Sequence, residues 1–481
     1  MTFTVSHTNA NRIFWGLSLL LAICVISFFL LKETSFVYIP FAILAVLFVL
    51  FYDIKVLFFL LLFFIPFSVE YAVTDTLSTD LPDEPMMVGL AGCIILYILY
   101  DPSTIKKYIK HPLIQLLFLE LTWIFITIFF AYEKEVSIKF LLAKSWYVLS
   151  FVFGTILLVR TKKDFALLAL CYVVPMLVIT VWTLYNHSFA GFSFAEANHV
   201  MHPFFRNHVN YSSLLVCVVP MLYLIRKFTP GLNKKLWKWV TVIILIGLLF
   251  SYARGAWLAL IVGLATFYIV KKNQLKKILQ LATLVVLLGV ALLSVNDNYL
   301  KFAPDHDQTI FHKDFGEHIV ATYTLRDVSN AERFYRWIAG VRMSMHQPLT
   351  GYGPNNFYAN YKRFADPRFR TWVSNNADHS SVHNYFLLLM IEQGIPGMII
   401  FYLLLFYMFL YAQNLYHRIK DEFYKEVSLS IAVILSMIIT VIMLSDLIET
   451  DKIGGLFYVC LGLLVTIDYK TRDEDKGIIP A

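Results

Sequence analysis

The sequence predicts an all-α, polytopic membrane helical bundle of 12 to 14 transmembrane helices with one large helical loop on the outer side of the membrane. The chain has 481 residues, of which 59% are hydrophobic and 15% are charged, whereas soluble domains carry about 25% charged residues. Its mean hydropathy is +0.67. Apolar runs of membrane-spanning length recur along it, and such runs form helices because backbone polar groups must be satisfied inside lipid.

Fourteen apolar runs are candidate membrane spans. They lie at 13–31, 36–52, 54–68, 86–100, 112–132, 138–159, 165–184, 209–226, 236–253, 255–270, 275–295, 383–413, 426–446 and 453–469. Three of these runs are short for a hydrocarbon layer of about 30 Å, so we expect one or two to be tilted or re-entrant. The first run has no small-residue cleavage site after it, and we interpret it as an uncleaved helix.

Lysine and arginine predict the orientation of the bundle. With the N-terminus inside, the cytoplasmic connections hold 23 basic residues and the short connections on the other side hold six. We therefore divide the chain into a transmembrane bundle of about 11 helices at 1–295, a large outer loop at 296–382, C-terminal transmembrane helices at 383–469 and a cytoplasmic tail at 470–481. The net charge of +7 follows from this topology, and we predict no nucleic-acid partner.

The unusual polar residues collect on the outer side. Ten of the thirteen histidines are assigned there, so an active site, if present, faces outward. His379 and His383 lie four residues apart where the long loop meets an apolar run, which places them on one helix face if the helix begins early. The alternative is a helix entry with polar caps.

The long loop contains one predicted helix. Ser329 and Glu332 form a capping-box pattern, and the helix should run from 330 to 347, before Pro348. One apolar stripe is formed by Phe334, Trp337, Ile338, Val341 and Met345. Arg333 and Arg336 flank this stripe on the same side; the alternative is a solvated basic face. The glycine-containing turn at 348–353 could bring backbone amides toward an anion.

Four further charged residues, Arg254, Glu120, Lys144 and Glu392, interrupt apolar runs. Arg254 lies between two runs with almost no loop, so we expect its guanidinium group at the outer interface, where such residues tend to be partnered or functional. The alternative is snorkelling at a helix end. Glu120 and Lys144 are expected to form an ion pair between neighbouring helices.

Several motifs together resemble the O-antigen ligase and O-antigen polymerase superfamily. His383 and Asn384 are followed after nine residues by Gly394 and, two residues later, Gly397, which gives the pattern H-[NSQ]-x9-G-x-x-G. The other matching pieces are Arg333, Trp337, the P-L-x-G-x-G segment at 348–353 and the S-x-A-R-G-A-W segment around Arg254. The resemblance covers about residues 200 to 410.

The resemblance implies a metal-independent, inverting membrane glycosyltransferase with a GT-C-like fold and a periplasmic loop. Such enzymes transfer a glycan from undecaprenyl pyrophosphate at the outer face of the bacterial inner membrane. The acceptor is lipid A–core in ligases and a growing glycan in polymerases, and no cofactor is expected. By carry-over, His383 is the catalytic base, and Arg254 and Arg333 bind the pyrophosphate. Secondary candidates are His379, Asn384, Arg336, Arg206 and His208.

Elementary chemistry is consistent with these roles. A neutral imidazole can take a proton from a sugar hydroxyl, and arginines can stabilise the charge that develops on a leaving pyrophosphate. A metal site is the first alternative, with Asp305 and Asp307 as a D-x-D motif or with His199, His202 and His208 as ligands. A polysaccharide-lipid transporter and a structural scaffold are two further alternatives. The full H-[NSQ]-x9-G-x-x-G match favours ligase slightly over polymerase.

Overall fold

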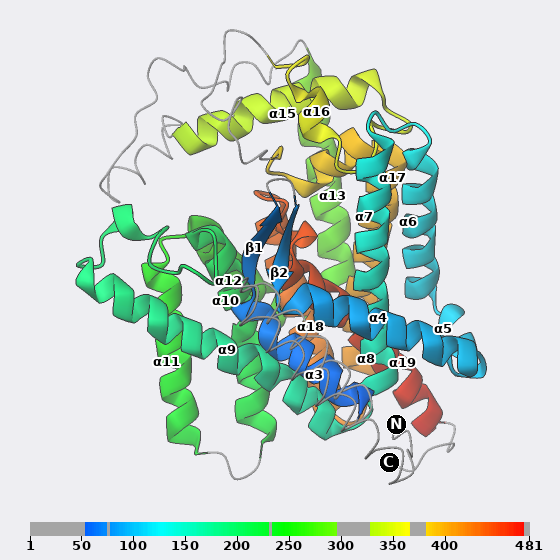
Figure 1. Ribbon diagram of the computed structural model, residues 1–481. Helices are drawn as coiled ribbons and strands as arrows, with labels where there is room; N and C mark the ends of the chain where they lie inside the picture. Colours follow the sequence, from blue (N-terminus) through cyan, green and yellow to red (C-terminus); the bar gives the residue numbers. More distant parts are fainter. Residues whose placement is uncertain (1–52, 75–76, 230–232, 296–327, 366–380, 476–481) are drawn as a thin grey trace, which may run out of the picture.

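The computed structural model describes residues 53–74, 77–229, 233–295, 328–365 and 381–475. Within these ranges the protein is a helical bundle with a single small hairpin, which confirms the predicted all-α membrane fold (Figure 1). Nine helices in the described part of the chain are long and apolar enough to cross a membrane, or ten if the bent pair α5 (Ser103–Ile109) and α6 (Pro112–Ile128) forms one span. The predicted spans 13–31 and 36–52 lie outside the described residues.

Most of the other helices lie where the apolar runs predicted them, and two, at 328–346 and 357–361, lie in the predicted outer loop, the second of them not predicted. The other helices are α3 (Ile54–Phe64), α4 (Asp83–Tyr100), α7 (Lys134–Tyr147), α8 (Gly154–Leu158), α9 (Lys162–Phe189), α10 (His208–Phe228), α11 (Lys234–Phe250), α12 (Arg254–Lys271), α13 (Leu275–Ser294), α15 (Val328–His346), α16 (Phe357–Tyr361), α17 (Tyr385–Arg418), α18 (Glu422–Ile442) and α19 (Asp451–Asp475). The runs at 54–68 and 236–253 give helices of 11 and 17 residues, α3 and α11. Neither is among the nine candidate spans.

Local sequence explains the start of α9, and a π-helical turn makes one span out of α7 and α8. Thr161 and Asp164 form a capping box at the start of α9, so the first backbone N–H groups of that helix are satisfied. A π-helical turn, η2 (Val148–Phe153), joins α7 to α8. These three pieces form one continuous span, Lys134–Leu158, which matches the predicted run at 138–159.

Helices α18 and α19 form the buried centre of the bundle. Both are almost entirely buried, and α18 packs against α10, α12 and α17. By contrast, α13 exposes leucines along most of its length, among them Leu281, Leu284 and Leu287. Exposed apolar side chains on a helix of this length are typical of a lipid-facing span.

A two-stranded antiparallel hairpin, which the sequence analysis did not predict, interrupts the helices. It consists of β1 (Val69–Thr74) and β2 (Leu77–Leu81), with Glu70 opposite Asp80. Lys452, at the start of α19, donates hydrogen bonds from Nζ to the carbonyl oxygens of Ser68 and Phe204. The hairpin is therefore tied to the last span and to the loop before α10.

Helices α15 and α16 lie across one end of the bundle, where α15 packs against α17 (Figure 1). Helix α15 begins two residues before the predicted start and ends one residue before the predicted end. Its predicted apolar stripe is wrong in part, because Val341 and Met345 are exposed. The buried residues are Tyr335, Arg336, Ile338, Ala339, Gly340, Met343 and Ser344. The face of α15 that packs against α17 includes Arg336, and a pattern of hydrophobic residues cannot predict a buried arginine.

Candidate active site

The candidate site is centred on the segment that leads into α17. Asn384 is the N-cap of α17, and its Oδ1 accepts a hydrogen bond from the backbone N–H of Leu387 at 3.0 Å. Its Nδ2 donates to the carbonyl oxygen of Met443, at the end of α18, at 3.1 Å. Asparagine is a preferred N-cap residue because its short polar side chain accepts a hydrogen bond from a backbone N–H in the first turn of the helix. Asn384 also positions His383 relative to α18.

His383 itself lies in an uncommon backbone conformation. Its φ is +54°, in the left-handed region, and its backbone N–H donates to Oγ of Ser381 at 3.2 Å. A non-glycine residue in this region is uncommon, and such residues collect at functional sites where the surroundings hold them. Here the Asn384 cap holds the chain on one side of His383, and Ser381 holds it on the other.

The outer helix α15 fixes the residues just before His383. Arg336 donates a hydrogen bond from Nη1 to the carbonyl oxygen of Ser381. Trp337 donates from Nε1 to the carbonyl oxygen of Val382 at 3.1 Å. A Cβ on Gly340 would lie 3.2 Å or less from side chains of Val382, Leu387 and Ile391. The absence of a side chain at Gly340 therefore lets α15 approach α17 closely enough for both hydrogen bonds.

Two arginines act on the imidazole electrostatically. Burial, together with the positive charges of Arg336 and Arg333, lowers the pKa of His383 from its usual value of 6.5 to about 3. The imidazole is therefore neutral at pH 7. Arg336 is only 2% exposed; burial lowers its pKa, and the nearby Tyr361, Glu332 and Asp446 act in the opposite direction. Of the two loop arginines, Arg336 is the more deeply placed, although the sequence analysis ranked it second.

Arg254 is the first residue of α12, and only three residues separate it from the end of α11, so the near-absence of a loop predicted there is confirmed. Two residues of the S-x-A-R-G-A-W segment stabilise the break between α11 and α12. Tyr252, with φ of +54°, donates from its hydroxyl to the carbonyl oxygen of Phe192 at 2.6 Å. Trp257 donates from Nε1 to the carbonyl oxygen of Leu248 at 2.9 Å.

The end of α18 connects the start of α12 to the His383 segment. A Cβ on Gly255, next to Arg254, would lie 3.8 Å from Leu444. The preceding residue, Met443, accepts the hydrogen bond of Asn384. The segments that carry Arg254 and His383 therefore both lie near the Met443–Leu444 turn, at the same end of the bundle.

The turn at 348–353 packs against a break in α17. Gly394 has φ of +73° and ψ of 179°, which interrupts the helix, and the backbone N–H of Ile395 donates to the carbonyl oxygen of Pro348 at 2.8 Å. A Cβ on Gly394 would meet the carbonyl oxygen of Leu349 at 2.3 Å. A Cβ on Gly351, where φ is +65°, would meet the backbone of Glu392 at 2.4 Å. The two glycine motifs of the sequence therefore pack directly on one another.

The prediction that this turn offers amides to an anion is wrong. Tyr352 and Gly353 donate their N–H groups to the carbonyl oxygens of Ile391 and Glu392, at 2.9 and 2.8 Å. Oε2 and Oε1 of Glu392 accept the N–H groups of Asn355 and Phe357, at 2.8 and 3.1 Å. These amides are used to attach the turn to α17. The sequence analysis missed this structural role of Glu392, although a carboxylate inside an apolar run was a signal for it.

The predicted Glu120–Lys144 ion pair is confirmed, at 3.9 Å between Nζ and Oε1. Lys144 also lies 3.5 Å from Oε1 of Glu449 and 3.5 Å from the hydroxyl of Tyr385. Glu449 follows the last turn of α18, and Tyr385 is the first residue of α17. A buried cation thus connects α7 to both segments that border His383.

The remaining secondary candidates are placed differently. Arg206 forms an ion pair with Glu70 of the hairpin, and its side chain is 68% exposed. His208 is the first residue of α10, with Nδ1 at 2.5 Å from Oδ1 of Asn198. These contacts attach the loop before α10 to its neighbours. His379 lies outside the described residues.

Among the described residues, no group of three or more His, Cys, Asp or Glu side chains could hold a metal ion. The rings of His199 and His202 stack with centroids 6.2 Å apart, and His208 faces Asn198 instead. The D-x-D motif, Asp305 and Asp307, lies outside the described residues.

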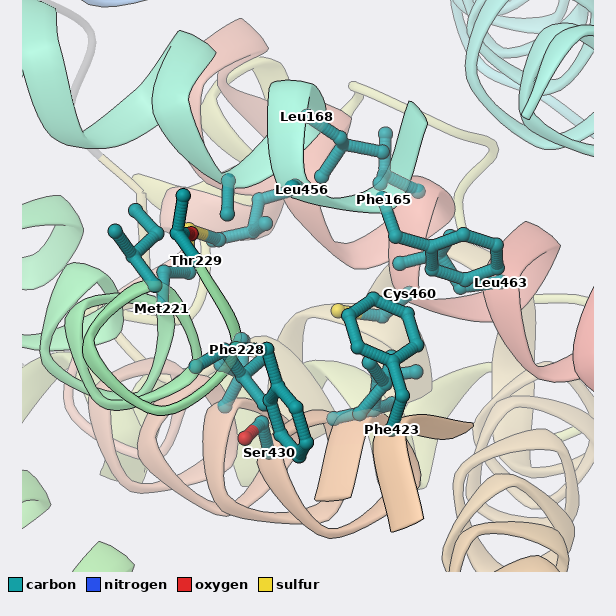
Figure 2. A pocket seen from close by; sticks show the side chains of 18 residues that line it. Phe165, Leu168, Met221, Phe228, Thr229, Phe423, Ser430, Leu456, Cys460 and Leu463 are labelled. Carbon is teal, nitrogen blue, oxygen red and sulfur yellow. The ribbon is translucent and has the colours of Figure 1, made fainter. Parts of the chain in front are cut away.

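An apolar cavity elsewhere in the bundle has a different character. Its volume is about 40 Å³, and it lies among α9, α10, α18 and α19 (Figure 2). Phe165, Phe228 and Phe423 line it together with aliphatic side chains and the buried Cys460. A cavity lined in this way suits hydrocarbon, and it carries none of the charged groups that surround His383.

Comparison with known proteins gives one family match. Residues 239–402 match the family model described as O-antigen ligase. The match includes Arg254, Arg333, Arg336, His383 and Asn384, and it excludes Arg206 and His208. The matched part, about a third of the chain, is similar to O-antigen ligases, which supports a ligase- or polymerase-type function in O-antigen synthesis. No curated protein matches the chain.

Proposed function

From its similarity to O-antigen ligases, we propose that this protein transfers a glycan from undecaprenyl pyrophosphate to an acceptor at the outer face of the bacterial inner membrane. The leading reaction is ligation of O-antigen to lipid A–core. The observation that carries the proposal is the neutral His383 imidazole held beside Arg336 and Arg333 where α15 meets α17.

His383 acts as the general base. As the acceptor hydroxyl attacks the anomeric carbon, its proton passes to the neutral imidazole, and the bond from that carbon to the pyrophosphate oxygen breaks. Attack opposite the leaving group inverts the anomeric centre. The left-handed backbone of His383 and the contacts on either side of it restrict the imidazole to a small set of positions, which suits a group that must meet its substrate in one geometry.

Arg333 and Arg254 bind the pyrophosphate and stabilise the negative charge that develops as it leaves. Arg336 does not contact the pyrophosphate in this proposal. Its buried guanidinium group bonds to the backbone of the His383 segment and holds that segment in position. Arginine charges supply this stabilisation without a metal ion. Transfer that persists in excess chelator supports this part of the proposal, and transfer that stops on chelation and returns with a divalent cation contradicts it.

Donor binding also prepares the base. In the free protein the two arginines lower the pKa of His383. A pyrophosphate bound by Arg333 and Arg254 brings negative charge that offsets the positive charges near His383, so the pKa of the imidazole rises. The base becomes more able to accept a proton only when the donor is in place, which limits wasteful reaction of the acceptor site with water.

A deletion strain examined for lipopolysaccharide banding tests the proposed reaction. Core without polymer supports ligation, and core with a single repeat unit supports polymerisation by the same chemistry. An unchanged banding pattern contradicts both. Complementation with His383→Ala or Arg333→Ala, expressed in the membrane at the level of the unmodified protein, should reproduce the deletion. If the protein were a transporter, its deletion would instead leave the lipid-linked glycan on the cytoplasmic face, which accessibility to an added glycosidase detects.

A further inference from the structure

A polar cavity lies at the other end of α17 from His383. Its volume is about 280 Å³, and it is lined by the end of α17 and the end of α19, including Tyr407, Tyr411, Asn414, Arg418, Asp468 and Arg472. The part of α17 after the break at Gly394, residues 395–418, has 24 residues, which is about 36 Å at about 1.5 Å per residue. The cavity is therefore remote from the proposed transfer site, at the face that the basic connections assign to the cytoplasm.

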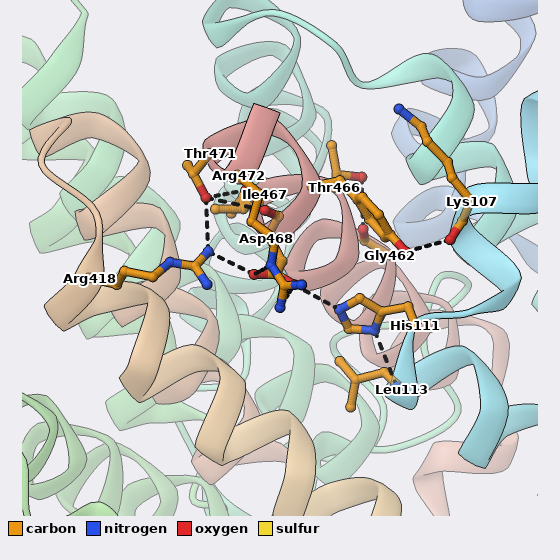
Figure 3. Close-up of polar contacts among 11 residues, drawn as sticks. Lys107, His111, Leu113, Arg418, Gly462, Thr466, Ile467, Asp468, Thr471 and Arg472 are labelled. Carbon is orange, nitrogen blue, oxygen red and sulfur yellow. Dashed lines mark hydrogen bonds and ion pairs between the residues drawn. The ribbon is translucent and has the colours of Figure 1, made fainter. Parts of the chain in front are cut away.

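One buried carboxylate organises the cavity. Asp468 is 1% exposed, and it lies 2.7 Å from Nη2 of Arg418 and 2.9 Å from Nη2 of Arg472. Nε2 of His111, at the start of α6, lies 3.2 Å from the same carboxylate. Figure 3 shows Arg418 and Arg472 converging on Asp468 from two helices. The two arginines and the aspartate leave one excess positive charge.

The arginines retain capacity for another acceptor. Their side chains are 39% and 50% exposed. Arg418 uses Nη2 for Asp468 and Thr471, and Arg472 uses Nε and Nη2 for Asp468. In the described part of the chain, Nη1 of both arginines therefore has no protein acceptor, although each guanidinium group carries five N–H donors.

We propose that this cavity binds the phosphate of an anionic phospholipid from the cytoplasmic leaflet. Two guanidinium groups held by one carboxylate match a phosphate diester, which takes hydrogen bonds from arginine forks. Basic pockets between transmembrane helices on the cytoplasmic side bind acidic headgroups in this way. Leu410 and Leu415 also line the cavity, so an acyl chain can follow the phosphate. This apolar wall favours a lipid over free phosphate.

A phospholipid bound in this cavity would connect helices of the bundle to one another. Arg418 lies on α17, Arg472 and Asp468 lie on α19, and His111 begins α6. A bound phosphate bridging Arg418 and Arg472 adds a connection between α17 and α19 at the membrane surface. This inference does not depend on the proposed transfer reaction, because it uses none of the residues near His383.

Thermal unfolding and native mass spectrometry of the purified full-length protein test the proposal. We expect phosphatidylglycerol to raise the unfolding temperature above that in phosphatidylcholine, with retained phosphatidylglycerol detected by mass. Each of Arg418→Gln and Arg472→Gln should weaken retention by about five-fold. Arg226→Gln is the matched control, because Arg226 is an exposed arginine at the same end of the bundle and should leave retention unchanged.

Further arms separate the alternatives. Arg418→Lys and Arg472→Lys keep a cation against Asp468, so they preserve folding and should still lose part of the retention because lysine lacks the planar fork. Inorganic phosphate at millimolar concentration should give no stabilisation. Equal retention of phosphatidylglycerol by the unmodified protein and the double Gln variant would overturn the proposal, and so would full stabilisation by inorganic phosphate alone.

Discussion

Arg336 donates a hydrogen bond to the carbonyl oxygen of Ser381, two residues before His383. The same buried guanidinium group lowers the pKa of the His383 imidazole. One side chain thus fixes the backbone of the proposed base and sets its protonation state. Burying the Arg336 guanidinium group costs free energy unless the group is hydrogen-bonded and balanced by nearby negative or polar groups.

Replacing Arg336 should therefore change how transfer depends on pH. In Arg336→Gln the positive charge is lost, the pKa of His383 rises toward 6.5, and the acid limb of kcat/KM moves to higher pH. In Arg336→Lys the charge remains, and the acid limb should stay near that of the unmodified protein. Rate measurements between pH 4 and pH 8 check this. Identical acid limbs in the unmodified protein and Arg336→Gln would disprove the electrostatic role.

Folding stability should also reveal the pKa of His383. Because the folded pKa of about 3 lies below the usual 6.5, the unfolded chain binds the extra proton, so this residue makes the folded state less stable as pH falls from about 6.5 toward 3. His383→Gln should therefore lose less stability than the unmodified protein between pH 7 and pH 5, by up to about 2 kcal/mol. Denaturant unfolding at both pH values measures this, and equal losses would contradict the lowered pKa.

The break in α17 should tolerate no side chain at Gly394. Gly394→Ala places a Cβ against the carbonyl oxygen of Leu349 and forces alanine into positive φ, so we expect a loss of more than about 1 kcal/mol. Gly289→Ala is the matched control, since nothing lies within 4 Å of a Cβ at that position of α13. Thermal unfolding in one detergent compares the two. Equal unfolding temperatures for the two variants would show that the break is not constrained.

Two variants of Asn384 distinguish its role in capping α17 from its role in positioning His383. Asn384→Ser keeps a side-chain acceptor for the start of α17 and loses the bond to Met443, whereas Asn384→Ala loses both. We expect Asn384→Ala to cost about 1 kcal/mol of stability, while both variants lower kcat. Unfolding and rate measurements on the same preparations distinguish the two effects. A Ser variant with unchanged kcat would assign Asn384 to capping alone.

The sequence predicted the described spans well because a membrane imposes long apolar helices. It also predicted the Glu120–Lys144 pair, since two opposite charges inside neighbouring spans need one another. The hairpin at 69–81 was missed because its strands are short, with six and five residues, and lie between two apolar runs. Motif order along the chain indicated the candidate site, including Arg254, Arg333 and His383.

The packing between segments that are distant in the sequence could not be predicted. The buried position of Arg336 depends on the approach of α15 to α17 at Gly340, and a helical projection shows only one helix at a time. The turn at 348–353 looked like an anion site because its partner, the break at Gly394, is distant in sequence. Its amides are consumed by that partner.

The central claim is that the neutral His383 imidazole takes the proton of the acceptor, and single-turnover transfer tests it most directly. Purified His383→Gln, supplied with a labelled lipid-pyrophosphate glycan and acceptor, should bind the donor as tightly as the unmodified protein and transfer it at least about 100-fold more slowly. His199→Gln, an exposed histidine in the loop before α10, should transfer normally. Transfer by His383→Gln at the unmodified rate would contradict the account.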